Sequence, residues 1–98
     1  MSKVLTEVSA SVPASRASEV IEAFRELTAR PLPDGLVRTE LLAGPNDEWR
    51  IQSLWRDRAA LDAMRSGPEP PAAPLLFRNL GTEPTLRVFE VSESHPTH

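Results

Sequence analysis

The sequence predicts an α+β domain with a ferredoxin-like βαββαβ order, in which a four-stranded antiparallel sheet carries its helices on one face. Three observations lead to this fold class. Four segments have the pattern of strands, two segments between them have apolar residues at helical spacing, and Pro or Gly separates the segments. Right-handed crossovers then bring both helices to the same face of the sheet.

The first half of the chain supplies a strand, a helix and a second strand. Apolar and polar residues alternate over residues 4–12, which predicts a strand that a proline ends. Ser15 or Ser18 is the candidate N-cap of the following helix, and Pro31 stops this helix. Residues 36–43 form the second predicted strand. The apolar residues at helical spacing are Val20, Ile21, Phe24 and Leu27.

The second half begins with a turn at residues 44–47, Gly-Pro-Asn-Asp, so we expect a hairpin there. The third strand covers residues 49–56, where apolar and polar residues again alternate. Asp57 is a favourable N-cap for a second helix, which Gly67 ends.

The last third of the chain is rich in proline. Four prolines in residues 66–74 predict an irregular stretch beside the pocket mouth, while residues 72–80 can hold one or two helical turns. Pro84 opens the last strand, and the polar residues 92–98 are expected to be a frayed tail.

Both faces of the predicted sheet carry apolar residues. In the second strand, Leu36 and Leu42 are expected on one face, and Val37 and Leu41 on the other. A face that met only water would be polar. We therefore expect a second copy of the chain to cover the outer face, as a homodimer that buries on the order of 1,500 Å².

Composition excludes several functional classes. The 98 residues fit one domain, residues 1–98, and the net charge of −3 with no basic run argues against nucleic-acid binding. The chain has no cysteine, which excludes thiolate nucleophiles and zinc ribbons. No apolar stretch is long enough to span a membrane, and the N-terminus has no signal-peptide pattern, so we expect a cytoplasmic protein with no membrane partner.

Few residues are equipped for proton transfer. Tyrosine is absent, and the two histidines, His95 and His98, lie in the tail, where disorder is a simpler interpretation than a metal pair. We expect no metal, heme or flavin cofactor, because the chain has no Cys, no His in an ordered element and no dinucleotide loop. The carboxylates that remain as proton carriers, or as cross-strand charges, are Glu7, Glu40 and Glu48.

A ligand pocket is expected between the helical layer and the sheet. Trp49 and Trp55 lie on one strand face, where each either fills the core or walls a pocket for a flat aromatic molecule, and we assign the wall to Trp55. Arg78 follows an apolar run and is the candidate cation over the mouth. The apolar substrate-binding residues are expected to be Phe24, Leu61, Met64, Leu76 and Phe77.

One segment resembles a known family. Residues 49–61, WRIQSLWRDRAAL, are followed by a helix and by the apolar run at residues 75–77, and together they resemble the antibiotic biosynthesis monooxygenase family of dimeric α/β-barrel proteins. The resemblance extends from Val4 to Val91, because the order of elements also matches. It implies oxygenation of an aromatic polyketide or quinol without a cofactor, in which the deprotonated substrate itself reduces dioxygen.

The resemblance transfers unevenly to the individual residues. Trp55 matches the tryptophan that ends the third strand in the family. This chain has Ile51 and Leu61 where polyketide oxygenases of the family have Asn and Tyr, and Met64 where heme-degrading relatives have Trp. The heme-ligating His of those relatives would fall near Pro74, which argues against heme degradation.

Two functions follow from these observations. The first is a cofactor-independent monooxygenase of secondary metabolism, in which Trp55 stacks on the substrate and Arg78 or Arg56 holds its enolate. The second is a non-catalytic domain of the same fold that binds a small ligand or acts as an accessory protein.

Overall fold

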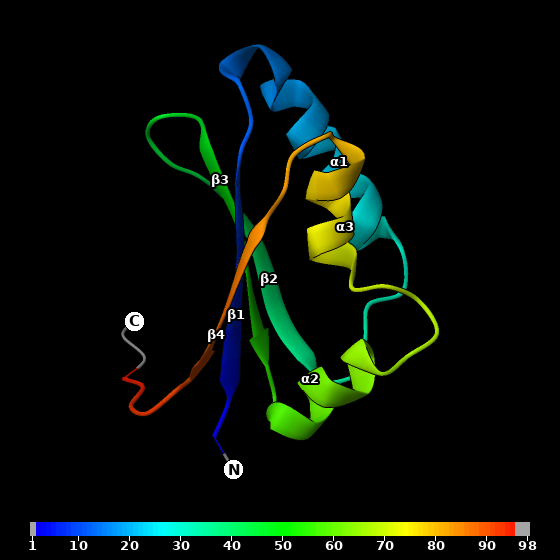
Figure 1. Cartoon of the computed structure of the whole chain (residues 1–98). Coiled ribbons are helices and arrows are strands. Elements are labelled where there is room, and N and C mark those ends of the chain that lie inside the picture. The colour runs from blue at the N-terminus through cyan, green and yellow to red at the C-terminus, as the bar shows by residue number, and fades with distance from the viewer. Residues whose placement is uncertain (1, 96–98) are drawn as a thin grey trace.

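The computed structural model describes residues 2–95 and has the predicted order of elements, with an unpredicted 3-10 turn before the first helix and a helix within residues 72–80, where one or two turns were expected (Figure 1). The ferredoxin-like α+β class is therefore confirmed. The strands are β1 (Val4–Ser11), β2 (Leu36–Ala43), β3 (Glu48–Trp55) and β4 (Thr85–Glu90). The helices are the 3-10 turn η1 (Ala14–Arg16), α1 (Ala17–Ala29), α2 (Arg58–Arg65) and α3 (Ala72–Asn79).

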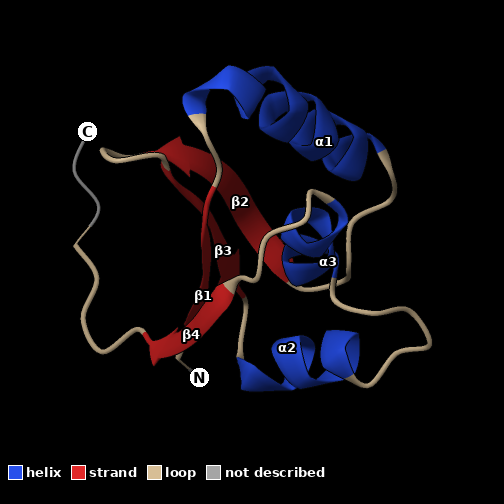
Figure 2. Cartoon of the chain, turned by 45° about the horizontal axis from the view of Figure 1, so that its top comes forward, coloured by secondary structure: helices blue, strands red, loops and turns tan. Residues whose placement is uncertain are grey.

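The four strands form one antiparallel sheet in the order β2-β3-β1-β4. All three α-helices lie on the same side of this sheet, as Figure 2 shows. Cross-strand partners share a face, so Trp55 beside Val4 and Ile51 beside Val8 lie under the helices. The sheet thus has one face that the helices cover and one that they leave open.

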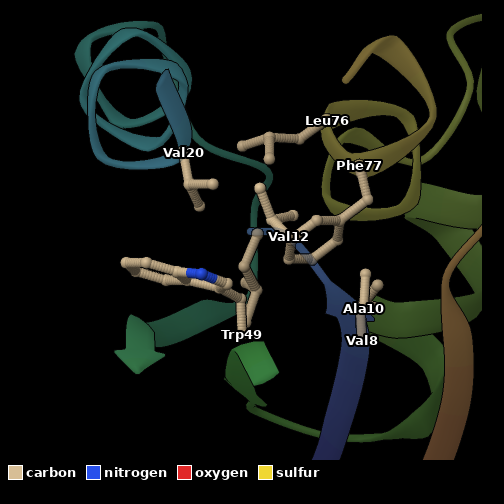
Figure 3. Close-up of a cluster of buried hydrophobic side chains, with 8 residues drawn as sticks. Val8, Ala10, Val12, Val20, Trp49, Leu76 and Phe77 are labelled. Carbon is tan, nitrogen blue, oxygen red and sulfur yellow. The ribbon is translucent and has the colours of Figure 1, made fainter. Parts of the chain in front are cut away.

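The main core forms where α1 and α3 meet the sheet. Val20 of α1 and Phe77 of α3 are 0% exposed, and they converge with Val12 on Trp49 of β3 (Figure 3). Trp49 is therefore a core residue, which decides between its two predicted roles. A second, smaller cluster of buried residues forms at the other end of the sheet, under α2, and consists of Val4, Trp55, Ala60 and Leu61.

An irregularity at the start of β2 corrects the predicted faces of this strand. Leu36 pairs with Trp55, whereas Arg38 pairs with the next residue of β3, Leu54, so one residue of β2 is extra. Because of this shift, Leu36 faces the helices together with Leu41, and not with Leu42 as strict alternation predicts.

Local sequence signals explain most element ends. Asp57 caps α2 as predicted, because its Oδ1 accepts a hydrogen bond from the backbone N–H of Ala60 at 2.9 Å. The β2–β3 turn has positive φ at Asn46 (59°) and Asp47 (63°), the two central residues of a turn that the N–H of Glu48 closes on the carbonyl of Pro45 at 3.2 Å, as in a type I′ turn. The predicted serine cap of α1 is wrong, because the η1 turn precedes this helix and Arg16 occupies its N-cap position.

The proline-rich segment separates α2 from α3. Residues 66–71 are irregular, as predicted, but regular helix resumes at Ala72 and includes Pro74, so the irregular stretch is shorter than residues 66–74. Pro74 is tolerated because it lies in the first turn, where a missing N–H removes no intrahelical hydrogen bond.

A glycine brings the start of β2 against α2. Gly35 has φ +85°, and a Cβ at this position would contact the Cβ of Ala60 at less than van der Waals distance. Only glycine therefore allows the chain to enter β2 this close to α2.

The open face of the sheet is mixed in character. Arg50 forms ion pairs there with Glu7 (3.1 Å) and Glu48 (3.0 Å). Apolar side chains flank these charges, and among them Phe89 of β4 is 37% exposed and lies under the guanidinium of Arg87. No helix among the described residues is long and apolar enough to cross a membrane.

Candidate pocket between the helices and the sheet

A cavity of about 590 Å³ lies between the helical layer and the sheet. Its floor comes mainly from the helix-facing positions of β1, β2 and β3, with Leu86 and Arg87 of β4, and its walls come from all three α-helices. Two exposed loops also line it, residues 31–33 after α1 and residues 67–71 between α2 and α3. The second loop is the proline-rich segment, which therefore borders the cavity as predicted.

A row of hydrogen bonds crosses the floor of this cavity. Trp55 Nε1 donates to Thr6 Oγ1 at 3.1 Å. Thr6 Oγ1 in turn donates a long hydrogen bond, 3.5 Å, to the backbone carbonyl oxygen of Ser53. On the neighbouring strand, Thr39 Oγ1 and Ser53 Oγ are 2.9 Å apart and share a hydrogen bond. The four side chains form a polar stripe across an otherwise apolar floor, and all of them line the cavity.

Trp55 belongs both to the core and to the cavity. Its side chain is 4% exposed and packs with Val4, Ala60 and Leu61 in the smaller core cluster. It also lines the cavity, and its only polar atom is satisfied by Thr6. The predicted alternatives of core residue and pocket wall therefore do not exclude each other for this tryptophan.

The predicted apolar walls divide into two groups. Leu61, Met64 and Leu76 line the cavity together with Trp55. Phe24 and Phe77 are not among the lining residues, because both pack into the main core. Phe77 is 0% exposed there, which leaves it no surface toward a ligand.

Arg78 is not at the predicted position over the cavity mouth. Its guanidinium pairs with Glu83 at 3.3 Å, and the residue is absent from the cavity lining. The reason is helical rotation, because two residues turn an α-helix by roughly 200°, so Arg78 points away from the direction of Leu76. The alternative cation, Arg56, is also absent from the lining and lies beside Asp57 and Asp34.

Sequence reasoning missed two arginines that do line the cavity. Arg30 follows α1 and Arg65 ends α2, both are exposed, and neither forms an ion pair within residues 2–95. Glu7, Glu26, Glu69 and Arg87 also line the cavity, and no ion pair among the described residues joins any of these carboxylates to Arg30 or Arg65. The signal that could have found them is position, since each lies beside one of the two proline-rich loops.

The perturbed titrating groups lie outside this cavity. The pKa of Glu19 is lowered mainly by the hydrogen bond that Arg16 donates, and the same contact raises the pKa of Arg16. The pKa of Arg50 is raised by its hydrogen bond to Glu48 and then by the charges of Glu48 and Glu7.

Metal ligands are sparse in the described part of the chain. Within residues 2–95 no group of three or more His, Cys, Asp or Glu side chains comes together. His95 is exposed in the tail, and His98 falls outside the described residues.

Comparison with known proteins identifies a family model that matches most of the chain. The model of antibiotic biosynthesis monooxygenases matches residues 1–73. No curated protein matches the sequence.

Several solved structures share the fold. A protein assigned as an antibiotic biosynthesis monooxygenase from Deinococcus radiodurans has a TM-score of 0.74 at 15% identity, covering 97% of this chain and 98% of that one. SnoaB from Streptomyces nogalater, a cofactor-independent oxygenase, has a TM-score of 0.71 at 18% identity and 97% and 98% coverage. The heme-degrader MhuD from Mycobacterium tuberculosis, solved with two hemes in its active site, has a TM-score of 0.69 at 20% identity and 95% and 99% coverage. At these identities the similarity establishes the fold alone.

Proposed function

The chain belongs to the antibiotic biosynthesis monooxygenase family, and from this premise we propose that it is a cytoplasmic, cofactor-independent monooxygenase of secondary metabolism. Its substrate in this proposal is a flat aromatic polyketide or quinol that binds in the cavity between the helices and the sheet. The observation that carries the proposal is the 590 Å³ cavity, which has Trp55 in its wall and mostly apolar side chains around it.

The chemistry requires little from the protein beyond binding and exclusion of water. An acidic CH₂ group of the substrate loses a proton to solvent at the cavity mouth, the carbanion adds dioxygen to give a hydroperoxide, and loss of water leaves a C=O group. The substrate thus supplies all the electrons that reduce dioxygen, so no resident redox group takes part. The enclosed part of the cavity keeps the carbanion away from water, and fixed side chains orient the ring for attack. In this proposal the substrate ring contacts the small part of Trp55 that lines the cavity, since 4% of this side chain is exposed.

The other cavity residues take simpler roles in this proposal. Met64 and Leu76 make apolar contacts with the ring system, and Leu61, which is 1% exposed, supports the wall from behind. Arg30 and Arg65 replace Arg78 as the cations that attract an acidic substrate, since they line the cavity and have no ion-pair partner among the described residues.

A binding and turnover experiment tests the proposal. In a Trp49→Phe variant Trp55 is the only tryptophan, so a panel of polycyclic phenols is titrated against its fluorescence while an oxygen electrode records uptake. We expect quenching that saturates and oxygen uptake that depends on the protein. A panel that never quenches Trp55 and never consumes oxygen would refute the proposal.

The alternative is a ligand-binding or accessory domain without catalysis. It is favoured by one observation: the chain has no tyrosine and His95 lies in the exposed tail, so only carboxylates, Glu7, Glu26 and Glu69, remain as proton carriers in the described lining of the cavity. Quenching without oxygen uptake is the result that would select this function.

We also propose that the protein is a homodimer formed through the open face of the sheet. Leu5 and Leu54 are half-buried there, Leu42 is exposed, and Phe89 is 37% exposed. A second copy would cover the row of Leu5, Leu54 and Phe89 at one end of the face, and Leu42, which pairs with Arg50 further along it.

Sedimentation equilibrium tests the dimer. The wild type should have twice the 10.8 kDa mass of the chain at micromolar concentration, and Leu54→Glu should reduce it to the monomer mass. Leu75→Glu on α3 is the matched control, because this leucine is also exposed but lies on the helical side. A wild type that sediments as a monomer would rule the dimer out.

A further inference from the structure

The hydroxyl pair on the cavity floor has one proton more than its own hydrogen bond needs. Thr39 and Ser53 carry one hydroxyl proton each, and the bond between their oxygens, 2.9 Å apart, uses one of the two. Within residues 2–95 neither hydroxyl makes a second hydrogen bond. One O–H donor is therefore left over, whichever residue donates in the shared bond.

The other polar groups of the floor have no such surplus. The N–H of Trp55 is used by Thr6, and the hydroxyl proton of Thr6 is directed at the carbonyl of Ser53. The surplus donor is thus confined to one point on the floor, where β2 meets β3. Ser53 is 8% exposed, whereas Thr39 is half-buried, so the point is more accessible on its β2 side.

We propose that the Thr39–Ser53 pair donates its surplus proton to an acceptor oxygen of the ligand, so that the cavity selects aromatic molecules with a carbonyl or phenolate oxygen at their buried end. The inference rests on the proposed function, because it assumes that the cavity takes a flat aromatic ligand. An aromatic hydrocarbon of the same shape would displace water from the pair and leave the donor unsatisfied, which costs affinity.

A purely structural role is the competing explanation. Thr39 and Ser53 are direct cross-strand partners, and hydrogen-bonded Thr and Ser pairs stabilise sheets wherever they occur. A structural pair would change the melting temperature when mutated but would not distinguish between ligands. The two explanations therefore differ in a ligand preference.

The test uses two probes of equal shape, 2-acetylnaphthalene and 2-isopropenylnaphthalene, which differ only in the exchange of C=O for C=CH₂. Affinities are measured by quenching of Trp55 in the Trp49→Phe variant. The unmutated floor should prefer the ketone by about fivefold, although the alkene is the more apolar molecule. This comparison needs no substitution on the floor. Because Trp49 is a core residue, circular dichroism first checks that Trp49→Phe is folded, and isothermal titration calorimetry repeats the comparison on the wild type.

Substitutions then locate the donor. In Thr39→Val/Ser53→Ala the preference should fall by about fivefold, while either single change should reduce it less, because the remaining hydroxyl keeps its proton. The exchange Thr39→Ser/Ser53→Thr should retain the preference. The matched control is Ser9→Ala/Thr85→Val, a cross-strand pair that lies outside the cavity lining and should leave the preference unchanged.

The possible outcomes separate this inference from the proposed function. Binding of both probes with equal affinity, or a preference that persists in the double variant, overturns the inference and leaves the aromatic site intact. Failure of the unmutated cavity to bind either probe overturns the proposed function, and the inference falls with it.

Discussion

The hydrogen bond between Trp55 and Thr6 offers a direct test of how the cavity wall is held. Trp55 is 4% exposed, and its Nε1 donates to Thr6 Oγ1 at 3.1 Å. Thr6→Val keeps the shape of the side chain but removes the acceptor, so a buried N–H loses its partner. Such a loss costs about 1–3 kcal/mol. We expect the lower end of this range, because Thr6 is only half-buried and valine gains apolar contact in a strand.

The expected loss converts to a measurable shift. In a domain of this length, 1 kcal/mol lowers the melting temperature by roughly 4–8 °C. Thermal unfolding followed by circular dichroism measures it, with Thr85→Val as the control at an exposed position of the same sheet. The control should change stability by less than about 0.5 kcal/mol.

A double-mutant cycle isolates the hydrogen bond from other effects of the substitution. Trp55→Phe removes the donor, so Thr6→Val in that background should cost little, and the coupling energy should be about 1 kcal/mol. If Thr6→Val melts like the wild type, or if its cost is the same with and without the indole, the hydrogen bond does not hold the wall and the reasoning is refuted.

Three further substitutions test local features. In urea titrations Gly35→Ala should lower the unfolding free energy by more than about 1 kcal/mol, because alanine adds both backbone strain and a clash with α2. Gly81→Ala should cost less, because Gly81 also has a positive φ (+82°) but has open space around it. Asp57→Ala should cost about 1 kcal/mol in thermal unfolding through loss of the α2 N-cap, and Asp57→Asn should retain most of the stability. The hydrogen bond from Arg16 lowers the folded-state pKa of Glu19. The wild type should therefore be more stable than Glu19→Gln above the ordinary carboxyl pKa, and this difference in stability should disappear as the pH falls through the lowered pKa. A stability difference that grows on acidification would contradict this assignment.

Most of the fold could be predicted from the sequence, because caps, turns and helix breaks depend on residues that are close together in the chain. Asp57 is a cap by its chemistry and by the apolar helical pattern that follows it, and the prolines of residues 66–71 exclude helix whatever surrounds them. The start of α1 was not accessible in this way. Arg16 lies at the N-cap position and its guanidinium donates to the carbonyl of Leu80, a contact between residues 64 positions apart. No local pattern reports such a contact.

The sequence predicted the cavity residues correctly only where helical or strand periodicity determines on which face of its element a side chain lies. Leu61 and Met64 lie one helical turn apart on α2, and their common face follows from their spacing. Thr39 could not be assigned in the same way, because its face depends on the extra residue between Leu36 and Arg38. Strict alternation from Leu36 would have put Thr39 on the opposite face from that leucine, away from the floor.

The cavity itself follows from the break between α2 and α3. A continuous helix over residues 58–79 would be a rod of roughly 33 Å, which would follow a single line across the sheet. The prolines divide it, so that α2 packs on β3 and α3 packs on β1. The two helices then support two separate core clusters, one around Trp55 and one around Phe77. Because neither cluster fills the floor between them, the polar stripe from Thr39 to Trp55 remains accessible to a ligand, and the loop that causes the break also borders the opening.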